Sequence, residues 1–409
     1  MKAMEGYAMN EGTTQAAEVI RLRQDIGDLL RRRVLEAVQM VLEEELSEAL
    51  GSGRYERCDE RRGYRNGHET RKITTELGPQ TLDVPRGRII EDDGSTKEFQ
   101  SEVVPRYARR TRKVDEAILG AYLAGSNTRR IRKALEPLLG SEHLSKSAVS
   151  RVVSRLKEQF AQWSGRDLSQ ERYAILFLDG FHLKVRMARR VVSVPVLAVL
   201  GVSPDGTKRL VALELAASEA ETHWSGLISD LERRGLESPV LVVSDGHRGL
   251  TKAIEAWPGA AVQRCTVHKW ENLVKHCPRQ AHRELKRDYD GIVYAKSAMA
   301  AREAYQTFVT KWQKLCPAVA RSLEEAGERL LTFYAFPKPM WKSLRTTNSI
   351  ENLNREFRRR TKTQASFSTE EAGLTLLFGL VAFRHIELRR ICGYVHVAAM
   401  LTSKTQNAA

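Results

Sequence analysis

Long apolar runs and cysteines are both scarce in this sequence of 409 residues, and each shortage excludes a class of protein. Because no stretch of about 18 apolar residues occurs, we expect no membrane-spanning helix. The first residues, MKAMEGYAMNEG, contain no apolar core, so we expect no secretory signal. The five cysteines are scattered and odd in number, which is typical of reduced thiols in a cytoplasmic protein.

Acidic residues are outnumbered by basic ones. The chain has 66 Lys and Arg against 51 Asp and Glu, a formal net charge of +15. Such a surplus favours a polyanionic partner, with nucleic acid first and a membrane surface second, although no isolated basic amphipathic helix supports a membrane contact. Hydrophobic residues make up 42% of the chain, which is too many for a disordered protein. A chain of 409 residues is too long to fold around a single hydrophobic core. We therefore expect two or three folded domains and a nucleic-acid partner.

The N-terminal quarter divides into a helix and a small basic region. Apolar residues recur at helical spacing up to Leu50, so residues 1–53 are expected to form a helical segment, which we connect with dimerisation. Residues 54–105 are rich in Arg and Gly. Two alternating runs, Lys72–Thr75 and Thr81–Val84, predict a small β-hairpin in this region.

Residues 106–165 are basic and contain three helical stretches, which begin near Val114, Thr128 and Ser145. In a helix-turn-helix arrangement the third stretch would enter the major groove of DNA, with its basic face toward the bases and phosphates. An ordinary helical bundle with a basic face is the alternative. The candidate DNA contacts in this segment are Arg109, Arg110, Arg129, Arg130, Lys146, Ser150, Arg151 and Arg155.

From residue 170 onward the patterns predict a mixed α/β core. Residues 170–265 contain strand-like runs and two helical stretches, residues 266–342 show helical periods alone, and residues 343–395 carry a basic helix followed by an apolar one. Residues 396–409 are left as a C-terminal tail. The expected strands are 174–178, 181–185, 190–202, 209–215, 240–244 and 260–264, and the expected helices are 222–234, 249–257, 346–362 and 370–390.

Asp179 and Asp245 each follow an apolar, strand-like run, in the sequences LFLDG and VSDG. Side chains at strand ends face an open crevice in α/β sheets, so we expect the two carboxylates to meet. Converging carboxylates repel each other unless a cation neutralises them, and Mg²⁺ prefers such hard oxygen ligands. For either residue alone, an ordinary Asp-Gly turn after a strand is the alternative.

Glu351, within TTNSIENLNR, is the third candidate ligand. The predicted helix places it among amide and cationic side chains, opposite an apolar face of Ile350, Leu353 and Phe357. A lone acid in that setting suits a metal ligand beside phosphates. Capping of the helix N-terminus by Glu351, or an ion pair with Arg355, is the alternative. The side chains of this segment that we expect to hold phosphates are Arg355, Arg358, Arg359, Arg360 and Lys362.

Three further features have a structural explanation beside the functional one. Cys265 and His268 have the spacing of zinc ligands, but no second cluster of that kind occurs, so we expect a structural or DNA-contacting role and no zinc. We expect His182 to be a strand residue and not a general base, because metal-bound water needs no separate base. Trp224 and Trp270 are expected to pack in a core or interface and not to stack on extruded bases.

Five stretches together resemble the Mutator-like family of bacterial insertion-sequence transposases. Each is modest alone, but their occurrence in this order along nearly the whole chain is highly specific. The stretches are GYRNGHETRKITTELGPQTLDVPRGR, LFLDGFHLKVR, LVVSDGHRGL, QRCTVHKW and TTNSIENLNREFRRRTK. The chain departs from the family pattern at Glu271, two residues before Leu273, where other members often carry Arg; a phosphate contact at that position is not carried over.

The resemblance implies an RNase H-like core that is interrupted by an all-helical insertion and preceded by DNA-binding segments. It makes Asp179, Asp245 and Glu351 a DDE triad that holds two Mg²⁺ ions, for which Mn²⁺ can substitute. The implied activity is that of a Mg²⁺-dependent DNA transposase, and the implied location is the cytoplasm, in association with the nucleoid. Such an enzyme binds terminal inverted repeats in double-stranded DNA, cleaves strands and joins the 3′-hydroxyl ends to target DNA. Pairing of two ends implies at least a homodimer.

Two other functions compete with this interpretation. An RNase H-like nuclease or resolvase would use the same three acids but would not join strands. A DNA-binding regulator would keep the fold without chemistry, and the presence of all three acids argues against it.

Overall fold

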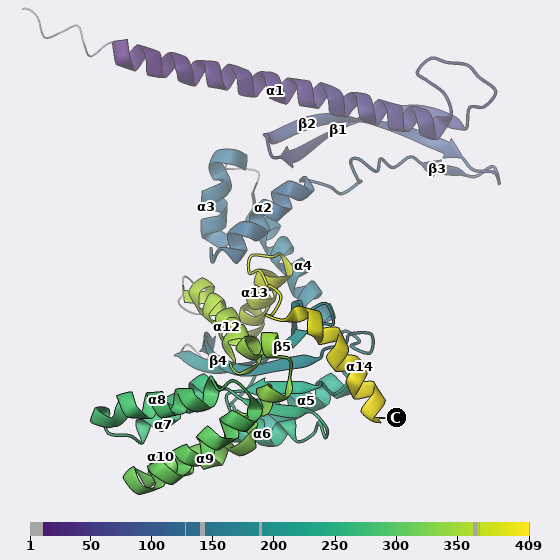
Figure 1. Ribbon diagram of the computed structural model, residues 1–409. Helices are drawn as coiled ribbons and strands as arrows, with labels where there is room; N and C mark the ends of the chain where they lie inside the picture. The colour runs from purple at the N-terminus through teal and green to yellow at the C-terminus, as the bar shows by residue number, and fades with distance from the viewer. Residues whose placement is uncertain are drawn as a thin grey trace, which may run out of the picture. The chain divides into compact units, whose positions relative to one another are not determined.

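The computed structural model describes residues 11–126, 128–139, 144–187, 190–362, 367 and 369–408. The chain forms two compact units (Figure 1). The N-terminal unit falls within Met1–Tyr122 and Asn127–Val152, and the C-terminal unit within Leu123–Ser126 and Val153–Ala409. None of the described helices has both the length and the apolar character needed to cross a bilayer.

The N-terminal unit packs a long helix against a small antiparallel sheet. Its elements are α1 (Glu11–Leu50), β1 (Gly63–Thr75), β2 (Gly78–Ile90) and β3 (Thr96–Glu98). The shared core is built from Leu42, Ile73, Leu82, Val84 and Val104. The predicted hairpin is confirmed, but its strands are much longer than the two runs that indicated it, and both extend through the Arg- and Gly-rich segment.

Pro85 lies inside β2, where a proline would normally interrupt a strand. It pairs with His68 next to a register shift between Arg65 and His68. The missing backbone N–H therefore falls where the ladder is already irregular, a position that tolerates proline. This position explains why β2 continues through Pro85, although the sequence pattern predicted that the strand would end there.

Three helices follow, at the positions that the sequence predicts: α2 (Arg112–Leu123), α3 (Thr128–Leu139) and α4 (Lys146–Ser164). In α4 the apolar face is buried, with Ala148, Val149 and Leu156 almost fully covered. Ser150 and Arg151 are exposed on the opposite side, as is Arg155. The predicted division of this helix into an apolar and a basic face is confirmed.

The C-terminal unit is built on a five-stranded mixed sheet of order β6-β5-β4-β7-β8. The first three strands in sequence form an antiparallel meander, and β7 and β8 run parallel to β4. Two helices, α5 and α6, connect the parallel strands. The bounds are β4 (Ile175–Met187), β5 (Arg190–Val202), β6 (Lys208–Leu215), α5 (Glu221–Arg233), β7 (Leu241–Ser244), α6 (Arg248–Ile254) and β8 (Ala261–Arg264). The expected mixed α/β architecture is confirmed.

The two faces of β4 contact different helices, because successive side chains of a strand point to opposite faces. Leu176 and Leu178 lie in the hydrophobic cluster that includes α5 and α6. Phe181, on the other face, lies 5.7 Å from Phe357 of α12 (Asn348–Thr361), measured between ring centroids. Figure 1 shows α12 and α13 on one side of the sheet and α5 and α6 on the other. Asp179 shares the face of Phe181.

Only helices and short turns occur between β8 and α12. The α-helices are α7 (Thr266–Lys275), α8 (His282–Val293), α9 (Ala298–Leu315), α10 (Pro317–Ala326) and α11 (Trp341–Leu344). An ion-pair cluster ties this region to the sheet: Arg264 and the fully buried Lys269 both bind Glu325 on α10. The predicted absence of strands from residues 266–342, all of which the structure describes, is confirmed.

The helix predicted over residues 370–390 ends earlier. Helix α13 covers Glu370–Ala382, and Arg384 has a left-handed backbone, with φ of 56°. The Ile386 N–H then donates to the carbonyl of Leu380 at 2.8 Å, which closes the last turn. A second helix, α14 (Val397–Ala408), occupies the segment that the sequence left as a tail.

Candidate active site

Asp179 lies inside β4 and not beyond the end of a strand, so the sequence interpretation is wrong on this point. The strand continues to Met187 through pairing with β5, where Asp179 faces Ala198. Pairing of β4 with β7, however, runs only from Ile175 to Leu178. Asp179 is thus the first residue of β4 beyond the end of its pairing with β7. The sequence analysis expected the carboxylate at such a place, in the crevice at the end of a parallel strand.

Asp245 directly follows β7, as predicted. Because Leu178 pairs with Ser244, the next residues of the two strands are Asp179 and Asp245, at the same level of the sheet. The backbone turns away there: Gly246 has φ of 80°, and the N–H of His247 donates to Asp245 Oδ1 at 2.8 Å. A Cβ on Gly246 would lie only 2.4 Å from Arg264 Nε, so this turn requires glycine.

The Asp179 carboxyl group is 8% exposed and has an unusual charge environment. Burial raises its pKa from 3.8 to about 7, with further contributions from the negative charges of Asp245 and Glu351. Two neighbours oppose this shift: the side-chain amide of Asn354 donates to Asp179 Oδ2 at 2.8 Å, and the positive charge of His268 favours the carboxylate. The charges of the other two predicted acids therefore both act on the buried Asp179 carboxyl group.

Glu351 lies in the first turn of α12, the helix that packs on β4. Its Oε1 accepts a hydrogen bond from the Thr347 hydroxyl and lies 3.8 Å from His268 Nδ1. The surface ion pair with Arg355 does not form, because Arg355 donates to Asn352 instead. Asn354, one turn further along α12, reaches Asp179 of β4.

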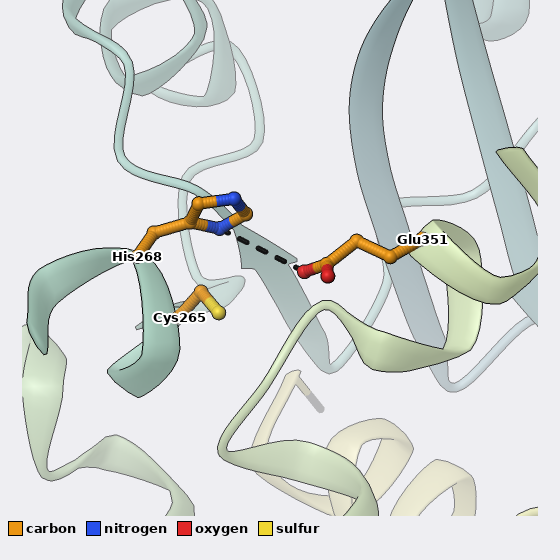
Figure 2. Close-up of side chains that lie close together, drawn as sticks. All are labelled: Cys265, His268 and Glu351. Atoms are coloured by element: carbon orange, nitrogen blue, oxygen red, sulfur yellow. Dashed lines mark ion pairs between the residues drawn. The ribbon is translucent and has the colours of Figure 1, made fainter. Parts of the chain in front are cut away.

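Cys265, the residue before α7, and His268, in the first turn of that helix, lie close to Glu351 (Figure 2). Cys265 is fully buried, and its Sγ accepts the backbone N–H of Thr347 at 3.3 Å. A hydrogen bond with Cys265 and the charges of Cys265, Glu351 and Asp245 raise the pKa of His268 to about 9, although burial opposes the shift. The motif thus adjoins the acid cluster, which the sequence alone did not indicate.

Asn354 is a site residue that the sequence argument missed. It is fully buried, and its Oδ1 has no hydrogen-bond partner among the described residues. A signal was present: at helical spacing Asn354 falls with Ile350 and Phe357 on the apolar face of α12, where an amide is out of place.

The basic residues of α12 are exposed beside this cluster. Arg355 and Arg358 are open to solvent, and Arg359 forms an exposed ion pair with Glu356 at 2.6 Å. All three can reach a polyanion, because exposed ion pairs exchange at little cost.

The candidate DNA contacts of the N-terminal half differ in their exposure. Arg110 is almost covered and binds Asp115 at 2.8 Å, so we attribute a structural role to it. Arg109 and Arg130 are exposed, and Arg151 is exposed with a hydrogen bond to the carbonyl of Ser147. The side chains of Arg129 and Lys146 lie outside the described residues.

The expectations for His182 and the two tryptophans agree with the structure. His182 is an exposed residue of β4, 3.9 Å from Glu219. Trp224 is buried in the core between α5 and the sheet. Trp270 packs against Tyr289 with ring centroids 5.7 Å apart.

Fold and site together define an α/β protein with a buried acid on the central strand of its sheet, two further acids whose charges act on it, and a basic helix that carries one of them. The model of the Mutator family of transposases matches residues 8–390, and the chain belongs to this family.

Curated relatives agree with the match. The chain is similar to the transposase for insertion sequence element ISRM5 of Rhizobium meliloti (35% identity, 92% of each chain). It is also similar to the transposase for IS1081 of Mycobacterium tuberculosis (33% identity, 95% of this chain and 94% of the relative). A third relative is the transposase for IS256 in transposon Tn4001 of Staphylococcus aureus (29% identity, 90% and 93%).

Proposed function

We propose that this chain binds the ends of an insertion sequence, cleaves DNA strands there and joins the freed 3′-hydroxyl groups to target DNA. The observation that carries the proposal is that a buried carboxyl group, Asp179, lies at the end of the pairing between two parallel strands, where the charges of Asp245 and Glu351 both raise its pKa. The relatives named above are transposases of insertion sequences and align along about nine-tenths of this chain. Local charge and family membership thus support the same chemistry.

The three carboxylates fit divalent cations of the magnesium class. Mg²⁺ takes hard oxygen ligands and keeps positions for water and phosphate oxygens. Among the described residues, no lysine or arginine forms an ion pair with Asp179, Asp245 or Glu351. When bound, two such ions activate water or a DNA 3′-hydroxyl and stabilise the leaving oxygen.

The chain's own residues hold and orient the carboxylates. Pairing with β5 fixes the backbone of Asp179, and the Asn354 amide holds one of its oxygens. The Thr347 hydroxyl holds Oε1 of Glu351. The strand order β6-β5-β4-β7-β8, with helices alone between β8 and α12, supports the interpretation of an RNase H-like core with a helical insertion.

Two basic surfaces supply the DNA contacts of this proposal. Arg355, Arg358 and Arg359 lie on the helix that carries Glu351, which places cations beside the acids to hold phosphates near the reaction. The exposed face of α4, with Ser150, Arg151 and Arg155, would recognise the ends of the element. Neither surface needs a conformational change to become accessible.

Asp179→Asn tests the proposal. This change keeps the side-chain volume and one oxygen acceptor but removes the charge, so strand cleavage should fall by on the order of 1000-fold or more, as when a group acting in the chemical step is removed. Binding to a duplex carrying one terminal repeat should change little. Cleavage of labelled ends and binding by gel shift are measured on the same preparations.

Pre-cleaved ends extend this experiment to the alternatives. Wild-type protein should join them to a target duplex in Mg²⁺, and Asp179→Asn should not. Cleavage without joining would identify a nuclease or resolvase instead. Near-normal cleavage by the Asp179→Asn variant would refute the role of these acids.

A dimer is part of the proposal, because two ends are cut and joined together. Exposed apolar side chains on α1, at roughly helical intervals, support α1 as the contact between two copies: Ile26, Leu30, Val34 and Val41. The molar mass from light scattering should correspond to two chains, and Leu30→Glu combined with Val34→Glu should halve it. An unchanged mass would exclude α1 as the interface.

A further inference from the structure

Cys265, His268 and Glu351 offer one sulfur, one nitrogen and one oxygen ligand. Their ligand atoms all lie within 4.8 Å of one another. Figure 2 shows the three side chains pointing toward one another from two separate helices. Magnesium takes hard oxygen ligands, whereas zinc and its relatives bind thiolate, imidazole and carboxylate together.

The backbone holds the two helix starts in place around these side chains. The Thr266 N–H donates to the carbonyl of Arg345 at 2.9 Å, and the Thr347 N–H donates to Cys265 Sγ at 3.3 Å. The second contact orients the sulfur in the way that outer hydrogen bonds orient metal ligands. Residues 266 and 345–347 therefore fix the distance between the Cys-x-x-His turn and Glu351.

We infer that Cys265, His268 and Glu351 form a binding site for thiophilic divalent cations of the zinc class, and that zinc held there competes with magnesium for Glu351. Only the competition rests on the proposed function. Tetrahedral zinc places its ligand atoms about 3.5 Å apart, so the side chains need to approach by about 1 Å. Such a site of three protein ligands leaves a fourth position for water.

Solvent can reach the site from one side. The side chains of His268 and Glu351 are 32% and 33% exposed, whereas Cys265 is buried behind them. A cation would enter past the imidazole and carboxylate, replace their mutual contact of 3.8 Å and release the protons of His268 and Cys265 to solvent. The exposure of two of the three ligands thus lets a cation bind to the folded chain.

Cobalt(II) is the probe, because thiolate-bound tetrahedral cobalt has a sulfur-to-metal charge-transfer band and intense visible bands. Titration of the full chain under reducing conditions should give both signals, saturating at one equivalent that zinc then displaces. Cys265→Ser should remove the charge-transfer band. His268→Gln and Glu351→Gln should weaken binding by more than the roughly 10–100-fold that outer partners of a ligand contribute.

Cys277→Ser is the matched control. Cys277 is also a buried thiol of the helical region, but it is not one of the three ligands, so this variant should keep the band. Loss of the band in Cys277→Ser with retention in Cys265→Ser would overturn the inference. So would wild-type cobalt spectra without a thiolate band, if circular dichroism shows that the protein is folded.

Competition is measured in the cleavage assay. At a fixed Mg²⁺ concentration, zinc is added at the concentration that fully displaces cobalt from the site. Zinc should then inhibit cleavage, and additional Mg²⁺ should relieve the inhibition. Zinc binding without inhibition would overturn the competition. Asp179→Asn separates the two proposals: it should abolish cleavage yet leave the cobalt spectrum unchanged, so each can fail without the other.

Discussion

Glu43 and Asp179 are acids, one in each unit of the chain, whose surroundings differ in both burial and charge. Burial acts to raise the pKa of Glu43, yet hydrogen bonds from His68 and Arg65 lower it overall. Burial raises the pKa of Asp179 to about 7 together with the charges of Asp245 and Glu351, although the Asn354 amide and the charge of His268 oppose the shift. The chain neutralises the first acid by itself and leaves the second cluster with an excess of negative charge.

The difference distinguishes a structural acid from a functional one. Glu43 joins α1 to β1, because Arg65 and His68 both lie on that strand. The Asp179 cluster is compensated only in part, by His268 beside Glu351, so its remaining negative charge costs stability until a cation binds. A cost of this kind is expected where function, and not stability, selects the residues.

The largest expected change in the free energy of unfolding is that of Asp179→Asn relative to the wild type, measured without divalent cations. Because the pKa of Asp179 is raised from 3.8 to about 7, the folded state retains a proton that the unfolded chain releases between these values. The free energy of unfolding therefore falls as pH rises through this window. Asp179→Asn should raise it by up to a few kcal/mol at pH values above about 7 and change it little near pH 4.

Denaturant unfolding in EDTA measures this effect. A variant less stable than the wild type at alkaline pH would show that the Asp179 carboxylate is already compensated within the chain. Added Mg²⁺ should stabilise the wild type and leave the variant nearly unaffected, because ligand binding to the folded state raises stability by mass action.

Asn354→Leu should reduce cleavage by roughly 10–100-fold, the range for losing an outer partner of a metal ligand. Leucine has a similar volume but cannot donate to Asp179 Oδ2, so the carboxylate loses its orientation. Asn352→Ala, on the exposed side of the same helix, is the control and should change cleavage little. Equal losses in both variants would indicate a general effect on α12.

Glu43→Gln should have the smallest effect and the opposite sign to Asp179→Asn. Because the pKa of Glu43 is lowered in the folded state, its stabilisation is present above about pH 4.5 and is lost as pH falls. The partly exposed ion pair contributes about 1 kcal/mol or less. Unfolding at pH 7 should show the N-terminal unit slightly destabilised, and a stabilised variant would remove the contrast between the two acids.

The local parts of this picture follow from the sequence. The run ending in Ser244 and the acid after it predict the position of Asp245, and the helical period places Glu351 in a first turn. The continuation of β4 through Asp179 was missed, because pairing with β5 extends the strand past the point where its apolar run ends. Periodicity reports which residues are buried, not how far a ladder continues.

Contacts across long sequence separations were beyond the sequence argument. Asn354 meets Asp179 across 175 positions, and Thr347 meets Cys265 across 82. Helical phase identifies Asn354 as a polar residue on an apolar face, but its partner depends on how α12 packs on the sheet. The same holds for Arg110. Its basic neighbours in the sequence predicted a DNA contact, and the structure adds its ion pair with Asp115.

The most direct test of the central claim is anomalous diffraction from crystals of the full chain soaked in Mn²⁺, which substitutes for Mg²⁺ at carboxylate sites. We expect manganese peaks coordinated by Asp179, Asp245 and Glu351, and their loss in Asp179→Asn crystals. A well-ordered site with no anomalous peak near these carboxylates at saturating Mn²⁺, or peaks that persist unchanged in the variant, would contradict the account.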